Sequence, residues 1–280
     1  MTALTRRTLL RLGAGVAGAC ALDPLWRLGI ATAAPGGEQP SPSSATGMPT
    51  RMSGSFVSAA RGGIETNWII ARPPGHAGPL RPVIALHGRD MDAAGVMDMG
   101  IEAGLAQLAR AGYPPFAVVA VDGGNTWWHR RVTGEDSGAM VLNELLPMLP
   151  TKGLDVSRVG FIGWSMGGYG ALLLGGALGA KRTAAICAVA PALYSDYGEA
   201  LAAGAFDGPA DWFAYSVYGT PALSEIPLRI DCGASDQYFK ATKQFVASLH
   251  KPPAGVSFEG GHDVAAWKEK LPRQLAWLAT

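Results

Sequence analysis

Apolar residues between positions 55 and 280 gather in short runs, and the segments between these runs show helical spacing. Strands buried in a parallel sheet form short apolar runs, whereas surface helices place an apolar residue every three or four positions. The pattern predicts strands at 56–60, 66–71, 83–86, 116–121, 159–162, 185–189, 228–232 and 256–258. The first two predict a hairpin. The alternation of later strands with helices favours a mostly parallel central sheet flanked by helices.

One junction between a strand and a helix carries a serine between glycines. The sequence Gly-Trp-Ser-Met-Gly at 163–167 follows the predicted strand 159–162 and precedes a helix predicted over 169–178. In this context a G-x-S-x-G motif forms a turn so tight that only glycine fits beside the serine, whose hydroxyl is then exposed. An ordinary turn is the alternative, but the flanking elements favour a nucleophile elbow with Ser165 as the nucleophile.

A serine hydroxyl needs a general base and a carboxylate that orients this base, and in such a fold both follow the serine in the chain. Asp236 lies in the loop after the strand 228–232, and His262 lies in the loop after the strand 256–258. These positions predict Asp236 as the acid and His262 as the base.

Other assignments of the carboxylate remain open. Asp236 also has the position of a helix N-cap, a role that is compatible with orienting a histidine. Asp231 lies within a predicted strand, and Asp263 adjoins His262 with its side chain expected to turn toward the next helix. Both are weaker candidates for the acid.

The negative charge that develops during acyl transfer requires preplaced N–H donors, which form an oxyanion hole. In this type of fold, one donor is the backbone N–H after the nucleophile, here Met166. The other comes from the loop after an earlier strand, and Arg89, directly after His87 and Gly88, has this position. His87 is expected to brace the loop.

Aromatic residues follow another strand on the same edge. Trp127, Trp128 and His129 come after the strand 116–121 and are predicted to contact substrate, since tryptophan faces suit a sugar or an aromatic ring. One of the two tryptophans can serve packing alone. The segment 192–225 is also rich in aromatic residues and predicts a small cap, whose aromatic side chains more often form its own core.

These motifs together resemble one branch of the α/β-hydrolases. The branch includes esterase D-like enzymes (S-formylglutathione hydrolases), feruloyl esterases and trehalose mycolyltransferases. The resemblance rests on LHG at 86–88, VDGG at 121–124, NELLP at 143–147, GWSMGGYGALLL at 163–174 and GGHDVAAW at 260–267. It covers most of residues 55–280. It implies a sheet of about eight strands, a triad of Ser165, Asp236 and His262, and no cofactor.

The N-terminus predicts an export signal of the twin-arginine type over residues 1–34. Arg6 and Arg7 precede an apolar run at 12–22, and an A-x-A cleavage pattern follows at 31–33. A basic amphipathic helix is the alternative. The apolar run is too short for a permanent membrane span. Lipidation of Cys20 is a second possible form of processing of this N-terminal segment. Residues 35–54 then form a Pro/Ser/Gly linker before the domain at 55–280.

Charge and cysteine content exclude several classes of protein. The chain has 23 basic and 22 acidic residues, a balance that gives no case for binding nucleic acid. No spacing of cysteine or histidine predicts a metal site. Cys187 and Cys232 lie in apolar strands and can form a disulfide in an oxidising compartment, although buried thiols are favoured.

The sequence therefore predicts an exported serine esterase that acts on a small-molecule or glycan-linked ester. Its expected partner for export is the twin-arginine machinery, and its location is secreted or associated with the cell envelope. One alternative is an acyltransferase that uses cell-envelope sugars as acceptors. A second is a carbohydrate-binding protein on a hydrolase scaffold. The acyl chain, the alcohol and the oligomeric state do not follow from the sequence.

Overall fold

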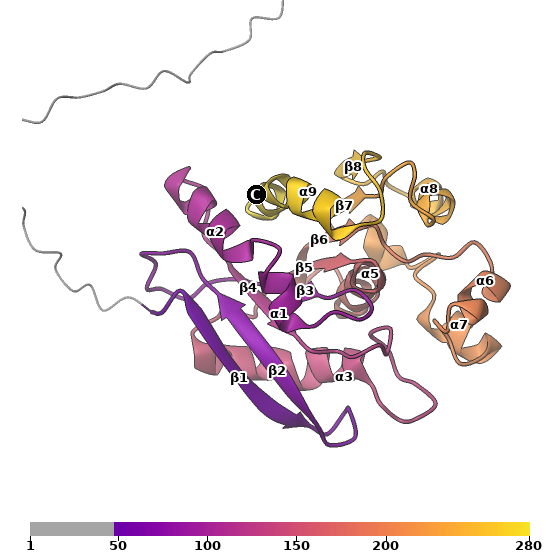
Figure 1. The fold of residues 1–280 in the computed structure, drawn as a ribbon, viewed down its shortest axis with the longest axis horizontal. Coiled ribbons are helices and arrows are strands. Elements are labelled where there is room, and N and C mark those ends of the chain that lie inside the picture. The colour runs from indigo at the N-terminus through magenta and orange to yellow at the C-terminus, as the bar shows by residue number, and fades with distance from the viewer. Residues whose placement is uncertain (1–47) are drawn as a thin grey trace, which may run out of the picture. The chain divides into compact units, whose positions relative to one another are not determined.

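A computed structural model describes residues 48–280, which build an eight-stranded sheet in the order β1-β2-β4-β3-β5-β6-β7-β8 (Figure 1). An antiparallel hairpin forms one edge, and β2 pairs antiparallel with β4, while every other pairing is parallel. The strands are β1 (Arg51–Ser58), β2 (Ile64–Ala71), β3 (Pro82–Leu86), β4 (Ala117–Val121), β5 (Val159–Trp164), β6 (Thr183–Val189), β7 (Leu228–Asp231) and β8 (Gly255–Ser257). The predicted fold class, a mostly parallel α/β sheet, is confirmed.

Helices cover both faces of this sheet, and its central strands are therefore buried on both sides. In β3, for example, Ile84 and Leu86 face one core and Val83 and Ala85 the other, as the two-residue period of a strand requires. The second core includes side chains of α1 (Ala93–Met97), α2 (Ile101–Arg110) and α9 (Val264–Leu278). The first includes side chains of α3 (Ser137–Met140), α4 (Leu146–Met148), α5 (Met166–Leu178) and α8 (Phe239–Ser248), with the helical turns Val141–Leu145 and Leu149–Lys152 beside α4.

The predicted cap lies between β6 and β7. It consists of α6 (Tyr197–Ala202), α7 (Pro209–Tyr215) and a 3-10 turn (Pro221–Ser224), and Figure 1 shows α6 and α7 in orange, apart from the sheet. Phe206 is buried and packs edge-on against Trp212 at a ring distance of 5.1 Å. The aromatic side chains of the cap thus pack against one another and join the core on one face of the sheet.

The first strand begins earlier than the sequence pattern suggested. β1 starts at Arg51, inside the range 35–54 predicted to be a linker. Its residues alternate between exposed and half-buried positions, and Met52 and Phe56 pack against the core while serines and a glycine separate them. The polar composition of these residues masked the two-residue period of the strand.

The predicted export signal and Cys20 lie outside the described residues. Among residues 48–280, no helix combines the length and the apolar composition needed to cross a membrane. Cys187 and Cys232 are both free and buried. Burial raises the pKa of the Cys187 thiol well above its usual range and that of Cys232 to about 12. Both behave as apolar core residues.

Candidate active site

Ser165 occupies a single-residue turn between the end of β5 and the start of α5. Its φ of +55° and ψ of −117° lie in a region that residues with a side chain rarely adopt, and such strain persists only where neighbours hold it. The Ser165 N–H donates to the carbonyl of Val189 at 2.9 Å, and its carbonyl accepts from the N–H of Ala192 at 2.9 Å. Both bonds join the turn to the end of β6.

The two glycines of the motif are needed because the turn presses against other backbone segments. A Cβ atom at Gly163 would clash with the carbonyl group of Gly167, and one at Gly167 would clash with the carbonyl group of Leu86. This is the collision that the sequence motif predicted. Ser165 itself stays partly exposed.

A chain of hydrogen bonds joins Ser165 to a histidine and a carboxylate. The Oγ atom of Ser165 lies 3.0 Å from Nε2 of His262, and Nδ1 of His262 lies 2.8 Å from Oδ2 of Asp236. Asp236 is 5% exposed, and its Oδ1 accepts from the N–H of Tyr238 at 2.8 Å. Asp236 thus orients the histidine with one oxygen and holds the turn before α8 with the other.

Sheet topology explains why residues so far apart in sequence meet here. Ser165, Asp236 and His262 follow β5, β7 and β8, whose carboxyl ends lie at one edge because the strands are parallel. The His262 ring packs edge-on against Tyr238 and Trp267, with ring distances of 5.2 Å to each. These two rings fix the plane of the imidazole.

The two alternative carboxylates have other partners. Asp231 is 2% exposed and forms an ion pair with Arg229, with oxygen to nitrogen distances of 3.0 Å, and it also accepts from Gln274 at 2.9 Å. Asp263 caps α9, since its Oδ1 accepts from the N–H of Ala266 at 2.9 Å. Of the three candidates, Asp236 is the one in contact with His262.

A hollow of about 380 Å³ opens over Ser165. Gly88 lies directly against the serine, because a Cβ atom at Gly88 would be 3.6 Å from the Ser165 Cβ. Arg89 and Met166, the predicted oxyanion donors, both line this hollow. Its other lining residues are Met91, Trp127, Tyr194, Ala203, Gln237, Tyr238, Val264 and Trp267, together with His262. Tyr194 comes from the aromatic segment 192–225, whereas Tyr238 was not singled out from the sequence, although it follows Asp236 by two positions.

His87 braces the loop that carries Arg89. Its Nε2 accepts from the N–H of Gly123 at 2.9 Å, so Nδ1 carries the proton and donates to the carbonyl of Gly88 at 2.7 Å. Burial lowers the pKa of His87, and the hydrogen bond to Gly88 offsets this only in part. The neutral ring thus joins the loop after β3 to the loop after β4.

Acidification is expected to weaken the fold through His87. Because the folded pKa lies below the unfolded value of about 6.5, the unfolded chain binds more protons between the two values, and stability falls as the pH drops below about 6.5. The loss is at most about 1.4 kcal/mol per pH unit. Urea unfolding of the wild type and His87→Gln at pH 7.5 and 5.5 measures it, with the smaller loss expected for the variant. Equal losses in both proteins would contradict this assignment.

Two of the three residues predicted to contact substrate do not reach the hollow. Trp128 is 0% exposed, and its indole fills a slot over Gly123 and Gly170, where a Cβ atom would clash with the ring, while a Cβ atom at Gly138 would clash with the Trp128 backbone carbonyl. The prediction of a substrate contact is wrong for Trp128, which belongs to the core. Trp127, by contrast, lines the hollow.

His129 is also buried, and it is not among the residues that line the hollow. Its ring nitrogens lie 2.9 Å and 3.0 Å from the carbonyl oxygens of Arg130 and Ala205. Its ring stacks against those of Phe206 and Tyr215, with distances between ring centres of 5.3 Å and 4.5 Å. The prediction of a substrate contact is therefore wrong for His129 as well. The residue fastens the cap to the loop after β4.

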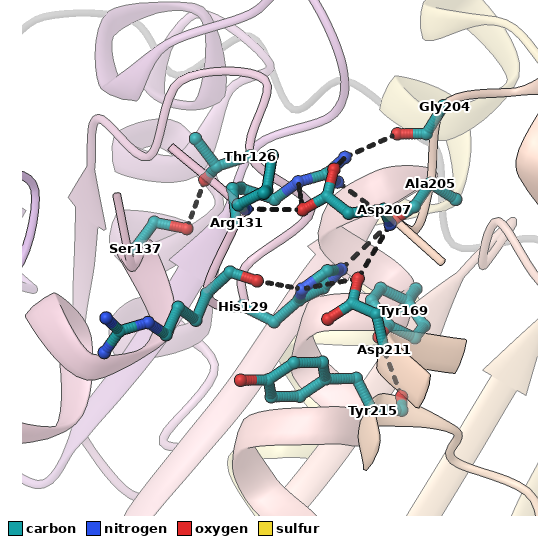
Figure 2. A network of polar contacts seen from close by, with 12 residues as sticks. Thr126, His129, Arg131, Ser137, Tyr169, Gly204, Ala205, Asp207, Asp211 and Tyr215 are labelled. Atoms are coloured by element: carbon teal, nitrogen blue, oxygen red, sulfur yellow. Dashed lines mark hydrogen bonds and ion pairs between the residues drawn. The ribbon is translucent and has the colours of Figure 1, made fainter. Parts of the chain in front are cut away.

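Other contacts strengthen this connection. Arg131 forms a two-pronged ion pair with Asp207, with distances of 2.6 Å and 3.1 Å, and donates to the carbonyl of Ala205 at 2.9 Å (Figure 2). The Tyr169 hydroxyl of α5 donates to the carbonyl of Tyr215 at 2.8 Å. The cap is thus tied both to the loop that carries Trp127 and to the helix that follows Ser165.

Within residues 48–280, no cluster of three or more His, Cys, Asp or Glu side chains is arranged to hold a metal ion. The Ser165 hydroxyl instead contacts an imidazole, which in turn is hydrogen-bonded to a buried carboxylate. Such a set suits transfer of an acyl group through a covalent serine intermediate.

Comparison with known proteins places this geometry in a fold class. The sequence matches no model of a protein family, and no curated protein matches it. Among solved structures, the substrate-bound serine hydrolase FphF of Staphylococcus aureus aligns with a TM-score of 0.65 at 18% identity, covering 82% of this chain and 98% of that one. An S-formylglutathione hydrolase of Agrobacterium tumefaciens aligns with a TM-score of 0.65 at 18% identity, covering 82% and 94%.

A ferulic acid esterase aligns with a TM-score of 0.67 at 16% identity, covering 82% of this chain and 97% of that one. At such identities the likeness concerns the fold. The chain has the α/β-hydrolase fold, and the solved structures similar to it include the kinds of enzyme that its sequence motifs resemble.

Proposed function

We propose that this protein is a serine esterase, which hydrolyses carboxylic esters through an acyl-enzyme intermediate on Ser165. The observation that carries the proposal is the hydrogen-bonded chain from Ser165 through His262 to Asp236, at the floor of an open hollow. A strained serine with a base in hydrogen-bond contact is the arrangement that nucleophilic catalysis requires. The fold shared with serine hydrolases and esterases supports the same reaction class.

In the first half of the reaction, the Ser165 Oγ attacks the ester carbonyl carbon while Nε2 of His262 accepts the hydroxyl proton. The carbonyl oxygen becomes an oxyanion, which the N–H groups of Met166 and Arg89 stabilise, each by about 3 kcal/mol. The bond from carbon to the alcohol oxygen then breaks, and His262 returns its proton to the departing alcohol. Ser165 is left as an ester of the acyl group.

The second half repeats these steps with water. His262 accepts a proton from the water molecule as its oxygen attacks the acyl carbon, and then gives that proton back to Ser165 as the free acid departs. Throughout, Asp236 holds the proton on Nδ1, so that Nε2 can act as the base. Partial exposure of Ser165 and of the His262 side chain, which is 23% exposed, leaves water a route to the acyl-enzyme.

The proposal includes export. Residues 1–34 would direct the chain to the twin-arginine machinery, and the enzyme would then act outside the cytoplasm or in the cell envelope, with Cys20 as a candidate lipid anchor. The support is the pair Arg6 and Arg7 before an apolar run, with an A-x-A pattern after it.

Product analysis separates hydrolysis from acyl transfer. We expect a short aryl ester, incubated with the purified protein and a sugar acceptor such as trehalose, to yield free acid as the main product, because water reaches the open hollow. Mass spectrometry of the products measures the partition. Acylated sugar as the main product at millimolar acceptor would replace the esterase by a transferase. Binding of sugars without any ester turnover would favour the carbohydrate-binding alternative.

A further inference from the structure

The two ends of the hollow have different roles in the proposed reaction. His262 must return a proton to the departing alcohol, so the alcohol lies at the end next to His262. The acyl substituent, attached to the opposite side of the carbonyl carbon, then points away from His262. The residues at the far end therefore meet the acyl chain.

That far end is closed by Trp127. The residue comes from the loop after β4, whereas His262 follows β8, and β5 with its serine lies between these strands in the sheet. Aromatic rings line the way from one end to the other. The distance between ring centres is 5.9 Å from Trp127 to Tyr194, 5.5 Å from Tyr194 to Tyr238 and 5.2 Å from Tyr238 to His262.

Trp127 and Tyr194 form a wall of the hollow, and a small apolar cavity lies on the other side of this wall, beneath the cap. Its volume is about 10 Å³, roughly the space of one water molecule, and apolar side chains such as Leu193, Phe206 and Val217 line it. Trp127 and Tyr194 line both the cavity and the hollow over Ser165. The indole of Trp127 therefore separates the nucleophile from an apolar space.

The wall is rigid. Trp127 and Trp128 both have φ near +60°, an uncommon conformation that the buried indole of Trp128 anchors in its glycine-lined slot. Trp127 is 4% exposed and packs edge-on against Tyr169 at 6.2 Å. The bonds from His129 and Arg131 to the cap hold the same loop from its other end.

We propose that Trp127 sets the size of the acyl group, so that this enzyme acts on esters of short acyl chains and excludes longer ones. This inference rests on the proposed esterase function. Removing the indole would join the hollow to the apolar cavity and make room for a longer chain, whose methylene groups would be removed from water there.

The test measures kcat/KM for p-nitrophenyl acetate, butyrate and octanoate with the wild type, Trp127→Ala and Val217→Ala. Val217 lines the cavity but not the hollow, so Val217→Ala enlarges the cavity without opening the wall. We expect the wild type and Val217→Ala to prefer acetate. Trp127→Ala is expected to raise the ratio of octanoate to acetate by on the order of tenfold or more.

Each outcome bears on one claim. A folded Trp127→Ala protein that hydrolyses acetate with an unchanged chain-length ratio overturns the role of Trp127, as does an equal shift in Val217→Ala. If Trp127→Ala does not fold, Trp127→Phe replaces it, with a smaller shift toward butyrate expected and no shift counting against the proposal. A wild type that hydrolyses none of the esters instead removes the proposed esterase function itself.

Discussion

Replacing Ser165 with alanine is expected to abolish covalent labelling by a fluorophosphonate probe and to lower kcat on an aryl ester by on the order of a millionfold. The probe reacts with a serine whose proton a neighbouring base removes, and Ser165 is the serine whose Oγ lies 3.0 Å from Nε2 of His262. Alanine leaves the base and the backbone bonds of the turn in place but removes the attacking oxygen. Probe labelling followed by mass spectrometry, with ester kinetics, measures both effects.

Ser235→Ala provides the matched control. Ser235 is exposed in the loop of Asp236, and its hydroxyl donates to the carbonyl of Gly260 at 3.2 Å rather than contacting His262. This variant should label and turn over at nearly the wild-type rate. If Ser165→Ala still labels at that rate, another residue is the nucleophile, and the elbow is only a structural turn.

The sequence predicted the sheet well because its central strands are apolar throughout. Helices cover both faces of the sheet at β3, β4 and β5, so every residue of these strands is buried and their sequences are apolar runs. Because parallel strands end at the same edge of a sheet, polar residues that directly follow such runs are predicted to lie together at that edge. This is why Ser165, Asp236 and His262 could be brought together before any distance was known.

Other features depend on residues far away in sequence, which no local pattern reveals. The slot for the Trp128 indole is made by glycines at 123 and 170, and the two tryptophans of the loop both have positive φ. A motif of two tryptophans in a loop therefore predicted an exposed platform where one ring is core. His129 likewise finds its partner, Ala205, within the cap.

The choice of the acid also needed distant contacts. Asp231 is accounted for by Arg229 on its own strand and by Gln274, which comes from α9 near the C-terminal end of the described chain. Sequence order alone left Asp231 and Asp263 as candidates. The contacts of all three carboxylates now make their substitutions distinguishable.

Asp236→Asn is expected to lower kcat by about ten-thousandfold while leaving the fold intact. The amide can keep a hydrogen bond to His262, but its NH₂ group can donate to Nδ1 and so favour the proton on Nε2. An imidazole with its proton on Nε2 cannot accept the proton of Ser165. Steady-state kinetics on a short aryl ester gives the loss in kcat, and urea unfolding checks that stability is retained.

The two other aspartates should respond differently, which makes the comparison decisive. Asp263→Asn should keep most of the activity, because asparagine also caps helices well. Asp231→Asn should cost stability, by about 3 kcal/mol or more, since it leaves the half-buried Arg229 without its charged partner while the folded fraction stays active. An Asp263 variant that loses more activity than the Asp236 variant would transfer the orienting role to Asp263, although Asp236 lies 2.8 Å from the histidine.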